Sequence, residues 1–434
     1  LAGLRAAERL REGGASVRVL EARDRVGGRT LLQDIGGVSF DLGAQWIGPT
    51  QDRMIALIER LGLTTHRQHT AGRKVLDVRG QVSTYKRSIP SLGPLHLVEL
   101  ERTMRRVDAL TARIDPDDPL ADPEAVAWDA QTVETYKHTI LSQTVRGLVD
   151  AMVRVVFGSE ASELSLLYFL YYLRLGGGLR RLVESEDGAQ QDVLVGGMGQ
   201  IAPLLAAELG EAVSLSQPVR AVRQDDHGVT VVTDAQTHRA QRVVVAIPPA
   251  LCGRLAWDPL LPSARDQLSQ RMPMASTIKC IAIYDRPFWR EAGFSGEVVC
   301  DGLPLAVTFD DCSPDGRHFA LLGFAVGKGG RQLGALPLAQ RRGLVLDRFA
   351  RWFGEAARSP LAYGDFDWSA EEFTRGCPIG VMQPGAFAMA GATLKAAVGR
   401  VHWAGTESAD VWTGFMEGAL QSGERAAAEV LAAL

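Results

Sequence analysis

The sequence predicts a mixed α/β fold, α+β overall, in which a doubly wound lobe is interleaved with a second lobe of mixed sheet and helices. Strands and helices alternate along the chain, but they do not form one uninterrupted βαβ series. A short strand at Val401–Trp403 leads through a loop into a C-terminal helix rich in small residues, and an apolar strand at residues 243–247 is stopped by two prolines. The start, middle and end of the chain therefore each supply a piece of the doubly wound lobe.

The two lobes are expected to be discontinuous in sequence. We predict that residues 1–66, 195–268 and 372–434 form the doubly wound lobe, and that residues 67–194 and 269–371 form the second lobe. The chain has 434 residues, of which 46% are hydrophobic, so it is long enough to bury the cores of both lobes.

The individual elements follow from the spacing of apolar residues and from turn residues. Helices are predicted at residues 4–11, 52–61, 95–114, 132–157, 162–175 and 337–353, and the last helix is predicted to begin at Thr413 or Gly414. Strands are predicted at residues 16–20, Thr277–Tyr284, 305–309 and Phe319–Val326, with a hairpin at 75–85 and a β-rich stretch at 213–249.

Charge and cysteine content exclude several classes of partner. The formal net charge is −4, which argues against nucleic acid. The five cysteines are scattered and odd in number, so they indicate no disulfide framework and no metal site, and we expect a cytoplasmic location. No run approaches the roughly 18 apolar residues of a membrane span, so we expect no membrane anchor.

The first residues resemble a dinucleotide-binding turn entered partway through. Gly3 has the position of the last glycine in a G-x-G-x-x-G turn, and we expect the first strand and the first two glycines to lie upstream of Leu1. Glu21 stands where a carboxylate accepts hydrogen bonds from the ribose of an adenosine. The N–H groups of Gly27 and Gly28 and the fork of Arg29 suit a pyrophosphate.

Several motifs in order carry a resemblance to the flavin-containing monoamine oxidases that covers nearly the whole chain. They are Leu-Glu-Ala-Arg-Asp-Arg-Val-Gly-Gly-Arg-Thr at 20–30, Gly-Ala-Gln-Trp-Ile-Gly-Pro-Thr-Gln at 43–51, Val-Gly-Gly-Met-Gly-Gln at 195–200, Val-Val-Ala-Ile-Pro-Pro at 244–249, Ser-Thr-Ile-Lys-Cys at 276–280, Ala-Gly-Thr-Glu at 404–407 and Gly-Phe-Met-Glu-Gly at 414–418. The pattern is closer to bacterial members similar to cyclohexylamine oxidase than to the animal enzymes.

The resemblance implies FAD as the cofactor and a Rossmann-like FAD-binding lobe in an amine oxidase architecture. The implied FAD-contacting residues are Ala2, Gly3, Glu21, Arg23, Gly27, Gly28, Arg29, Gly43, Ala44, Gln45, Trp46, Val219, Trp368, Cys377, Gly405, Glu407 and Met416. Cys377 aligns with the cysteine that carries the flavin covalently in the animal enzymes. Because Pro378 follows it instead of tyrosine, we favour a non-covalent FAD and keep the covalent link as the alternative.

The resemblance also implies the catalytic residues, which are Lys279, Trp368 and Phe415. From its own segment, Lys279 is either a lysine whose head reaches water or a buried functional lysine; the family match favours a lysine that holds a water beside the flavin. Trp368 matches a tryptophan that packs on the flavin. Phe415 matches one wall of an aromatic cage, and Pro378 replaces the second wall, which leaves room for a bulkier or alicyclic amine.

The expected substrate pocket is apolar. Its residues are Val156, Phe157, Leu182, Val183, Gln190, Val307, Phe309, Phe324, Pro378 and Phe415. Such a pocket favours an uncharged amine and offers no anchor for a carboxylate.

We therefore expect FAD-dependent oxidation of a small, largely apolar amine to an imine, with dioxygen reduced to hydrogen peroxide and the imine hydrolysed to a ketone or aldehyde and ammonia. The expected partners are the amine and dioxygen, and a homodimer is left open. The alternatives are an L-amino-acid or polyamine oxidase, a flavin-dependent C–C desaturase, and, least favoured, a non-catalytic FAD-binding module.

Overall fold

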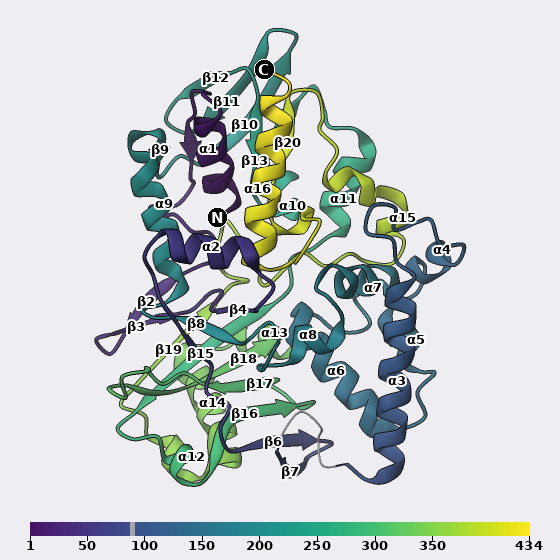
Figure 1. Cartoon of the computed structure of the whole chain (residues 1–434), viewed down its shortest axis with the longest axis vertical. Helices are drawn as coiled ribbons and strands as arrows, with labels where there is room; N and C mark the ends of the chain where they lie inside the picture. Colours follow the sequence, from purple (N-terminus) through teal and green to yellow (C-terminus); the bar gives the residue numbers. More distant parts are fainter. Residues whose placement is uncertain (87–91) are drawn as a thin grey trace.

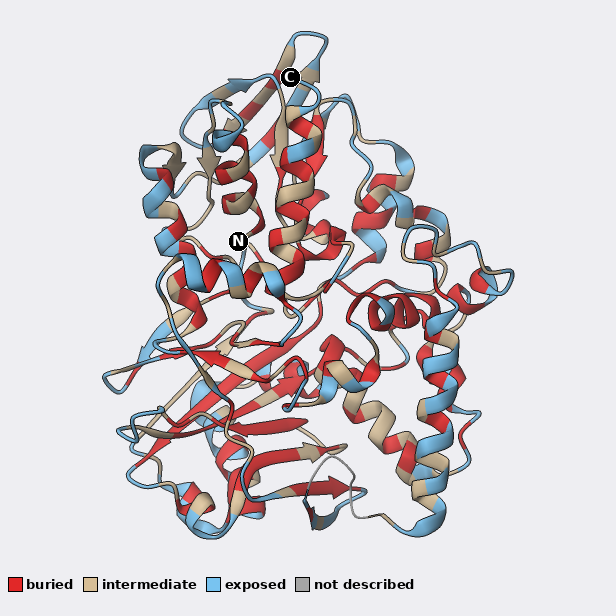
Figure 2. Cartoon of the chain, in the orientation of Figure 1, coloured by how far each residue is buried: buried red, intermediate tan, exposed pale blue. Residues whose placement is uncertain are grey.

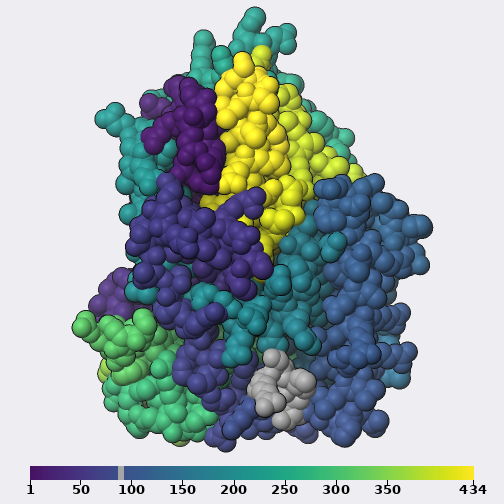
Figure 3. Space-filling view, in the orientation of Figure 1, coloured from purple at the N-terminus to yellow at the C-terminus, as the bar shows by residue number. Residues whose placement is uncertain are grey.

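Helices α1 (Ala2–Glu12) and α16 (Met416–Leu431) come from opposite ends of the chain and lie side by side (Figure 1). The computed structural model describes residues 1–86 and 92–434. A side chain at Gly423 would place its Cβ atom 2.4 Å from the carbonyl oxygen of Ala2, which is closer than Cβ atoms approach an oxygen. Glycine therefore permits the close approach of the two helices, whose surfaces adjoin in the space-filling view (Figure 3).

Two parallel strand pairs combine distant parts of the chain. Strand β1 (Val19–Leu20) pairs with β9 (Val213–Ser214), and β13 (Val243–Val245) pairs with β20 (Val401–Trp403). A second sheet, in the order β12-β11-β10-β14, shares a hydrophobic core with β13 and β20. The strands of this sheet are β10 (Val219–Asp225), β11 (Gly228–Thr233), β12 (Thr237–Ala240) and β14 (Ala256–Asp258). The predicted mixed fold is confirmed, while the lobe boundaries stay a prediction.

The largest sheet has seven strands in the order β19-β15-β18-β17-β16-β6-β7. Its strands are β6 (Arg73–Val78), β7 (Gln81–Tyr85), β15 (Thr277–Tyr284), β16 (Phe294–Cys300), β17 (Val307–Asp310), β18 (Phe319–Val326) and β19 (Ala362–Asp367). All eight residues of β15 are buried, and Lys279 on this strand lies opposite Phe324 of β18 and Phe366 of β19. A lysine is thus held inside the molecule by the two neighbouring strands.

Helices and short strands surround these sheets (Figure 1). The remaining strands are β2 (Leu32–Ile35), β3 (Val38–Asp41), β4 (Trp46–Ile47), β5 (Thr65–Arg67) and β8 (Asp192–Leu194). The remaining helices are α2 (Asp52–Arg60), α3 (Pro94–Ala112), α4 (Ala125–Asp129), α5 (Val133–Lys137), α6 (Gln143–Phe157), α7 (Leu166–Leu175), α8 (Leu179–Val183), α9 (Ile201–Leu209), α10 (Pro249–Cys252), α11 (Ser263–Arg271), α12 (Phe288–Glu291), α13 (Lys328–Gly334), α14 (Leu338–Phe353) and α15 (Ala386–Ala390).

One predicted helix is wrong, because residues 132–157 form two helices instead of one. Helix α5 ends at Lys137, and α6 begins at Gln143. The carboxylate of Glu99 accepts hydrogen bonds from the N–H groups of Leu141 at 2.5 Å and Ser142 at 2.9 Å, and the Ser142 hydroxyl caps α6 by accepting from Val145. These polar partners stabilise a helix break that apolar spacing does not reveal.

The C-terminal helix also begins later than predicted, at Met416. Gly414 has a φ of +86° and Trp412 a φ of +49°, and both lie outside the conformation of a right-handed helix. The loop residues 412–415 therefore precede the helix, and Gly414 and Phe415 line the cavity described below.

The most buried helix is α7, in which every residue except Arg174 is buried (Figure 2). Its apolar surface packs on other helices of the same molecule. Among the described residues, no helix combines the length and the apolar character that crossing a membrane requires.

Candidate active site

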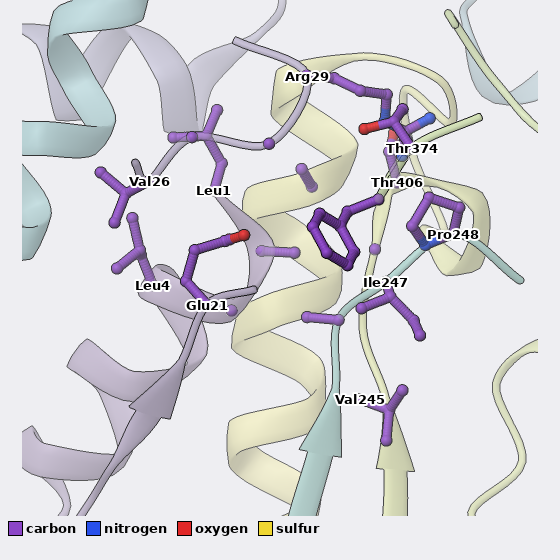
Figure 4. A pocket seen from close by; sticks show the side chains of 18 of the residues that line it. Leu1, Leu4, Glu21, Val26, Arg29, Val245, Ile247, Pro248, Thr374 and Thr406 are labelled. Carbon is purple, nitrogen blue, oxygen red and sulfur yellow. The ribbon is translucent and has the colours of Figure 1, made fainter. Parts of the chain in front are cut away.

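A cavity of about 1390 Å³ extends from the parallel strand pairs to the seven-stranded sheet. At one end its wall includes the start of α1, the end of β1 and the first turn of α16 (Figure 4). At the other end its wall includes residues of α6, β15, β17 and β18. The cavity therefore joins the start, middle and end of the chain in one continuous space.

The predicted FAD-contacting residues gather around this cavity. Those that line it are Ala2, Gly3, Glu21, Arg23, Gly27, Gly28, Arg29, Gly43, Ala44, Gln45, Trp46, Val219, Trp368, Cys377, Gly405 and Met416. Glu407 is not among the described lining residues. It is buried behind the wall, with 3% of its surface exposed.

Glu21 presents an acceptor to the cavity. Its Oε1 atom accepts hydrogen bonds from the backbone N–H and the Nη1 group of Arg23, both at 3.0 Å. Its other carboxylate oxygen receives no hydrogen bond from the described residues, and the side chain points into the pocket (Figure 4). Arg23 is fixed by Glu371 and Thr374, both at 2.5 Å. A free carboxylate oxygen at this position fits a ribose hydroxyl.

The Gly27–Gly28 turn presents donors to the same cavity. The φ angles are +103° at Gly27 and +60° at Gly28, and a Cβ atom at Gly28 would meet nothing within 4 Å. The N–H groups of Gly27, Gly28 and Arg29 donate no hydrogen bond to the other described residues. Backbone donors without a protein partner beside an open space fit a phosphate.

The guanidinium of Arg29, which was predicted to contact a pyrophosphate, is bound to other residues of the chain. Both of its terminal nitrogens donate to Glu407, at 2.6 and 2.9 Å, and Nη1 also donates to the carbonyl oxygen of Pro378 at 2.6 Å. The Glu407 side chain is only 1% exposed, so its charge requires this partner. Arg29 therefore ties the glycine turn to the segments at residues 378 and 407.

Lys279 reaches the cavity from the centre of the large sheet and is 0% exposed. Its ammonium group donates to the side-chain oxygen of Gln45 and, at 3.4 Å, to the carbonyl oxygen of Gly43. It also lies 5.4 Å from the ring centroid of Trp46 and 5.6 Å from that of Phe324. Burial lowers the pKa of Lys279, and the nearby carboxylates of Asp311 and Asp41 oppose this shift.

Phe415 forms an aromatic wall just before α16. Its ring centroid lies 5.0 Å from that of Trp412, in an edge-to-face arrangement, and 6.4 Å from that of Tyr172. Trp412 is anchored by a hydrogen bond from its indole to the carbonyl oxygen of Thr50 at 3.1 Å. Pro378 also lines the cavity, and its role as the second wall of the cage stays a prediction.

Trp368 is almost fully buried, at 1% exposed, and lines the cavity. Its indole donates to the carbonyl oxygen of Leu42 at 2.8 Å, and its ring packs 4.8 Å from that of Phe366. These contacts fix the ring against the cavity.

Most of the predicted substrate residues line the end of the cavity near Lys279. They are Val156, Leu182, Gln190, Val307, Phe309, Phe324, Pro378 and Phe415. Phe157 and Val183 lie outside the described lining: Phe157 packs against Phe169 and Tyr172, and Val183 is 39% exposed. Each follows a lining residue on a helix, where successive side chains point about 100° apart.

Sequence reasoning missed Tyr172, which lines the cavity beside Phe415. It stands in a helix that is apolar on all sides, so no periodicity marks the side that faces the cavity. A side chain at Gly414 would lie 2.3 Å from the hydroxyl oxygen of Tyr172, so glycine at residue 414 makes room for this tyrosine.

Polar groups are few at this end of the cavity. Among the described lining residues from α6, α7, α8, β15, β17, β18 and residues 189–190, only Lys279 carries a charge. Gln190 donates to the carbonyl oxygen of Leu182 at 3.2 Å, and its own side-chain oxygen is buried without a hydrogen-bond partner. The arrangement suits an apolar ligand with one hydrogen-bond donor.

Cys377 also lines the cavity. Burial raises the pKa of its thiol to about 11, although Arg29 opposes the shift. The thiol is therefore protonated at neutral pH and is a weak nucleophile.

Comparisons with known proteins agree with this arrangement. The family model described as flavin containing amine oxidoreductase matches residues 1–431. A probable flavin-containing monoamine oxidase A of Dictyostelium discoideum is 39% identical over 99% of this chain and 95% of its own length.

Two solved structures are also similar over nearly the whole chain. Cyclohexylamine oxidase from Brevibacterium oxydans IH-35A superposes with a TM-score of 0.95 at 33% identity, covering 100% of this chain and 97% of its own. Wild-type putrescine oxidase bound to putrescine superposes with a TM-score of 0.95 at 30% identity, covering 99% and 97%.

Proposed function

This chain belongs to the family of flavin-containing amine oxidoreductases, and on that basis we propose that it oxidises a small, largely apolar amine with dioxygen. The amine, alicyclic or aryl-alkyl, loses two electrons and two protons to become an imine. Water hydrolyses the imine to a ketone or aldehyde and ammonia. Dioxygen takes up the two electrons and two protons and leaves as hydrogen peroxide.

The proposed substrate class rests on the residues that line the cavity near Lys279. The described lining of this end is apolar apart from Lys279, Gln45, Gln190, Tyr172 and Thr277, and it contains no carboxylate. A diamine needs an anionic partner for its charged second nitrogen, and an amino acid needs for its carboxylate a cation other than Lys279, to which we assign the role of facing dioxygen. An amine with a single nitrogen on an apolar body has neither of these needs and therefore fits this lining.

We propose that FAD occupies the rest of the cavity. Glu21 would hold the ribose, the N–H groups of residues 27–29 would hold the pyrophosphate, and the start of α16 would add its positive dipole end. FAD bound here supplies the hydride acceptor and passes the electrons on to dioxygen. Because the thiol of Cys377 is protonated at neutral pH, we propose that the attachment is non-covalent.

The residues of this chain would orient the amine and exclude water. Phe415 and Pro378 would confine its apolar body, and the unpaired side-chain oxygen of Gln190 would accept an N–H of its neutral amino group. Trp368 would pack on the cofactor. The Lys279 ammonium would face dioxygen and stabilise the negative charge that builds up on it during reduction.

Peroxide release tests this proposal. The purified protein is supplied with cyclohexylamine, benzylamine, tyramine, putrescine and an L-amino acid at several concentrations, and peroxide is measured in a coupled assay. Turnover is expected with the first three, and cyclohexylamine or benzylamine is expected to have the highest kcat/KM. Highest activity with putrescine or the amino acid would contradict the proposed substrate class.

The role of Gln190 can be tested with the same assay. Gln190→Met removes the acceptor while keeping the length of the side chain, and a loss of about fivefold in kcat/KM is expected for the preferred amine. Gln340→Met, on the exposed surface of α14, is the matched control and should leave kcat/KM unchanged.

A further inference from the structure

A chain of hydrogen bonds continues behind the cavity wall at Lys279. The Lys279 ammonium donates to the side-chain oxygen of Gln45, and the side-chain nitrogen of Gln45 donates in turn to the carboxylate of Asp311. Lys279 is 0% exposed and Gln45 is 3% exposed, so water screens these contacts little. Lys279 and Gln45 line the cavity, whereas Asp311 is not among the described lining residues. The carboxylate thus stands one side chain behind the ammonium group.

The amide between the two charges can bind in only one orientation. Its oxygen accepts from the ammonium, and its nitrogen donates to the carboxylate. Of the three donors of Lys279, one meets Gln45 and one meets the carbonyl oxygen of Gly43. The third donor has no hydrogen-bond partner among the described residues and is left for the cavity. The amide of Gln45 therefore links Lys279 to the negative charge of Asp311, and the Asp311 carboxylate itself does not line the cavity.

The other acids near Lys279 have partners of their own. Asp41 accepts from the N–H groups of Met198 and Gly199 at 2.7 and 2.9 Å. Asp310 is bound to Arg290 and to the indole of Trp289. Cys377, the remaining titratable group that acts on Lys279, carries a protonated thiol.

Asp311 differs from these groups. The only side-chain hydrogen bond of its carboxylate among the described residues is the bond from Gln45. Burial raises the pKa of Asp311 and lowers that of Lys279, and each of the two groups opposes the shift of the other. Among the described residues, Lys279 and Gln45 are the groups that most strongly favour the charged form of the half-buried Asp311, and His66 adds a smaller effect.

We propose that Gln45 and Asp311 are positioning residues that hold the Lys279 ammonium in place and charged where it faces dioxygen. This inference rests on the proposed function. As dioxygen takes up two electrons from the oxidation of the amine and two protons, negative charge develops on it before the protons arrive. A fixed positive charge in a cavity that excludes water stabilises that charge most effectively, because the group does not have to reorient.

The charge on Lys279 can be measured directly, without catalysis. The holoenzyme is labelled with [ζ-¹⁵N]lysine, the Lys279 signal is assigned by its loss in Lys279→Met, and the signal is followed over pH. In Asp311→Asn and Gln45→Met the midpoint of this titration is expected at lower pH than in the parent. Asp315→Asn, an exposed residue of the same segment, is the matched control and should titrate like the parent. An unchanged midpoint in both variants would overturn the proposal.

A second measurement uses reaction with oxygen but needs no amine. The protein is reduced with dithionite, mixed with oxygenated buffer, and the return of flavin absorbance is timed over pH. Asp311→Asn is expected to reoxidise about tenfold more slowly at neutral pH, and its rate is expected to decline at a lower pH than that of the parent. Equal rates and equal pH profiles would contradict the inference.

These two measurements separate the inference from the proposed function. If no amine reduces the protein, the proposed function fails while both measurements remain interpretable. If Asp311→Asn does not fold, Gln45→Met carries the same expectations. In a folded Asp311→Asn, the flavin content and the rate of reduction by an amine are expected to match the parent, because Asp311 is not among the described residues that line the cavity. A general loss of structure would lower both.

Discussion

Arg29 and Glu407 form a bidentate ion pair across 378 positions of the sequence, with N–O distances of 2.6 and 2.9 Å. The pair joins the glycine turn at residues 27–28 to the loop that precedes α16. The cavity wall is therefore held together by a buried charge pair between the start and the end of the chain.

Removing one partner of this pair is expected to be costly. Arg29→Met leaves the Glu407 carboxylate, whose side chain is 1% exposed, without its counter-charge. A loss of about 3–5 kcal/mol in the free energy of unfolding is expected. Chemical denaturation measures it, and Arg105→Met, which breaks the exposed pair with Glu101, should cost less than about 1 kcal/mol. Similar losses in the two variants would contradict this role.

The close packing of α1 on α16 predicts opposite effects for the same substitution at two helical glycines. Gly423→Ala would bring a Cβ atom 2.4 Å from the carbonyl oxygen of Ala2 and is expected to destabilise the protein by about 1–3 kcal/mol. Gly343→Ala lies in α14, where a Cβ atom would meet nothing within 4 Å, and is expected to stabilise by up to about 1 kcal/mol. Thermal unfolding of both variants checks the contrast. If Gly423→Ala does not lower the unfolding temperature, the close contact between α1 and α16 is contradicted.

The pH dependence of stability is expected to contain a contribution from Asp41. Burial raises the pKa of Asp41 from 3.8 to about 6. The folded protein therefore binds this proton more tightly than the unfolded chain does, so the contribution is present below pH 3.8 and is lost as pH rises through about 6. Denaturation of the parent and of Asp41→Asn from pH 4 to 7 isolates it. The stability of the parent relative to the variant should fall with rising pH, and a rise would contradict the expectation.

The attachment of the flavin can be settled by denaturation. Because the thiol of Cys377 is protonated at neutral pH, we expect the yellow chromophore to remain in the supernatant when the holoenzyme is precipitated with acid. Cys377→Ser is expected to retain the parent's flavin content. Colour in the washed parent pellet, and its absence from the variant pellet, would show a covalent bond through this sulfur.

The sequence predicts those elements whose pattern is local. Strands β15 and β18 have the predicted bounds, because each is a largely apolar run that follows a polar residue and stops before a polar residue or a glycine. The break between α5 and α6 depends on Glu99 of another helix, which is invisible to local spacing.

The same distinction holds for the site. The resemblance predicts that Lys279, Trp368 and Phe415 share one site, because each matches a family motif that can be recognised in the sequence. All three line the cavity. It does not show that Phe157 and Val183 turn away from that cavity, since this depends on the rotation of two helices. Nor does it show that Arg29 is bound to Glu407, because a distant buried carboxylate determines where the guanidinium points.

Anaerobic reduction of the bound flavin tests the central claim most directly. The yellow holoenzyme is mixed without oxygen with cyclohexylamine, benzylamine or putrescine, and the visible absorbance is followed. We predict rapid bleaching by the two apolar monoamines, little by putrescine, and recovery of colour with peroxide release when air is admitted. A holoenzyme that none of these amines bleaches, or that putrescine bleaches fastest, would contradict oxidation of a small apolar amine at this site.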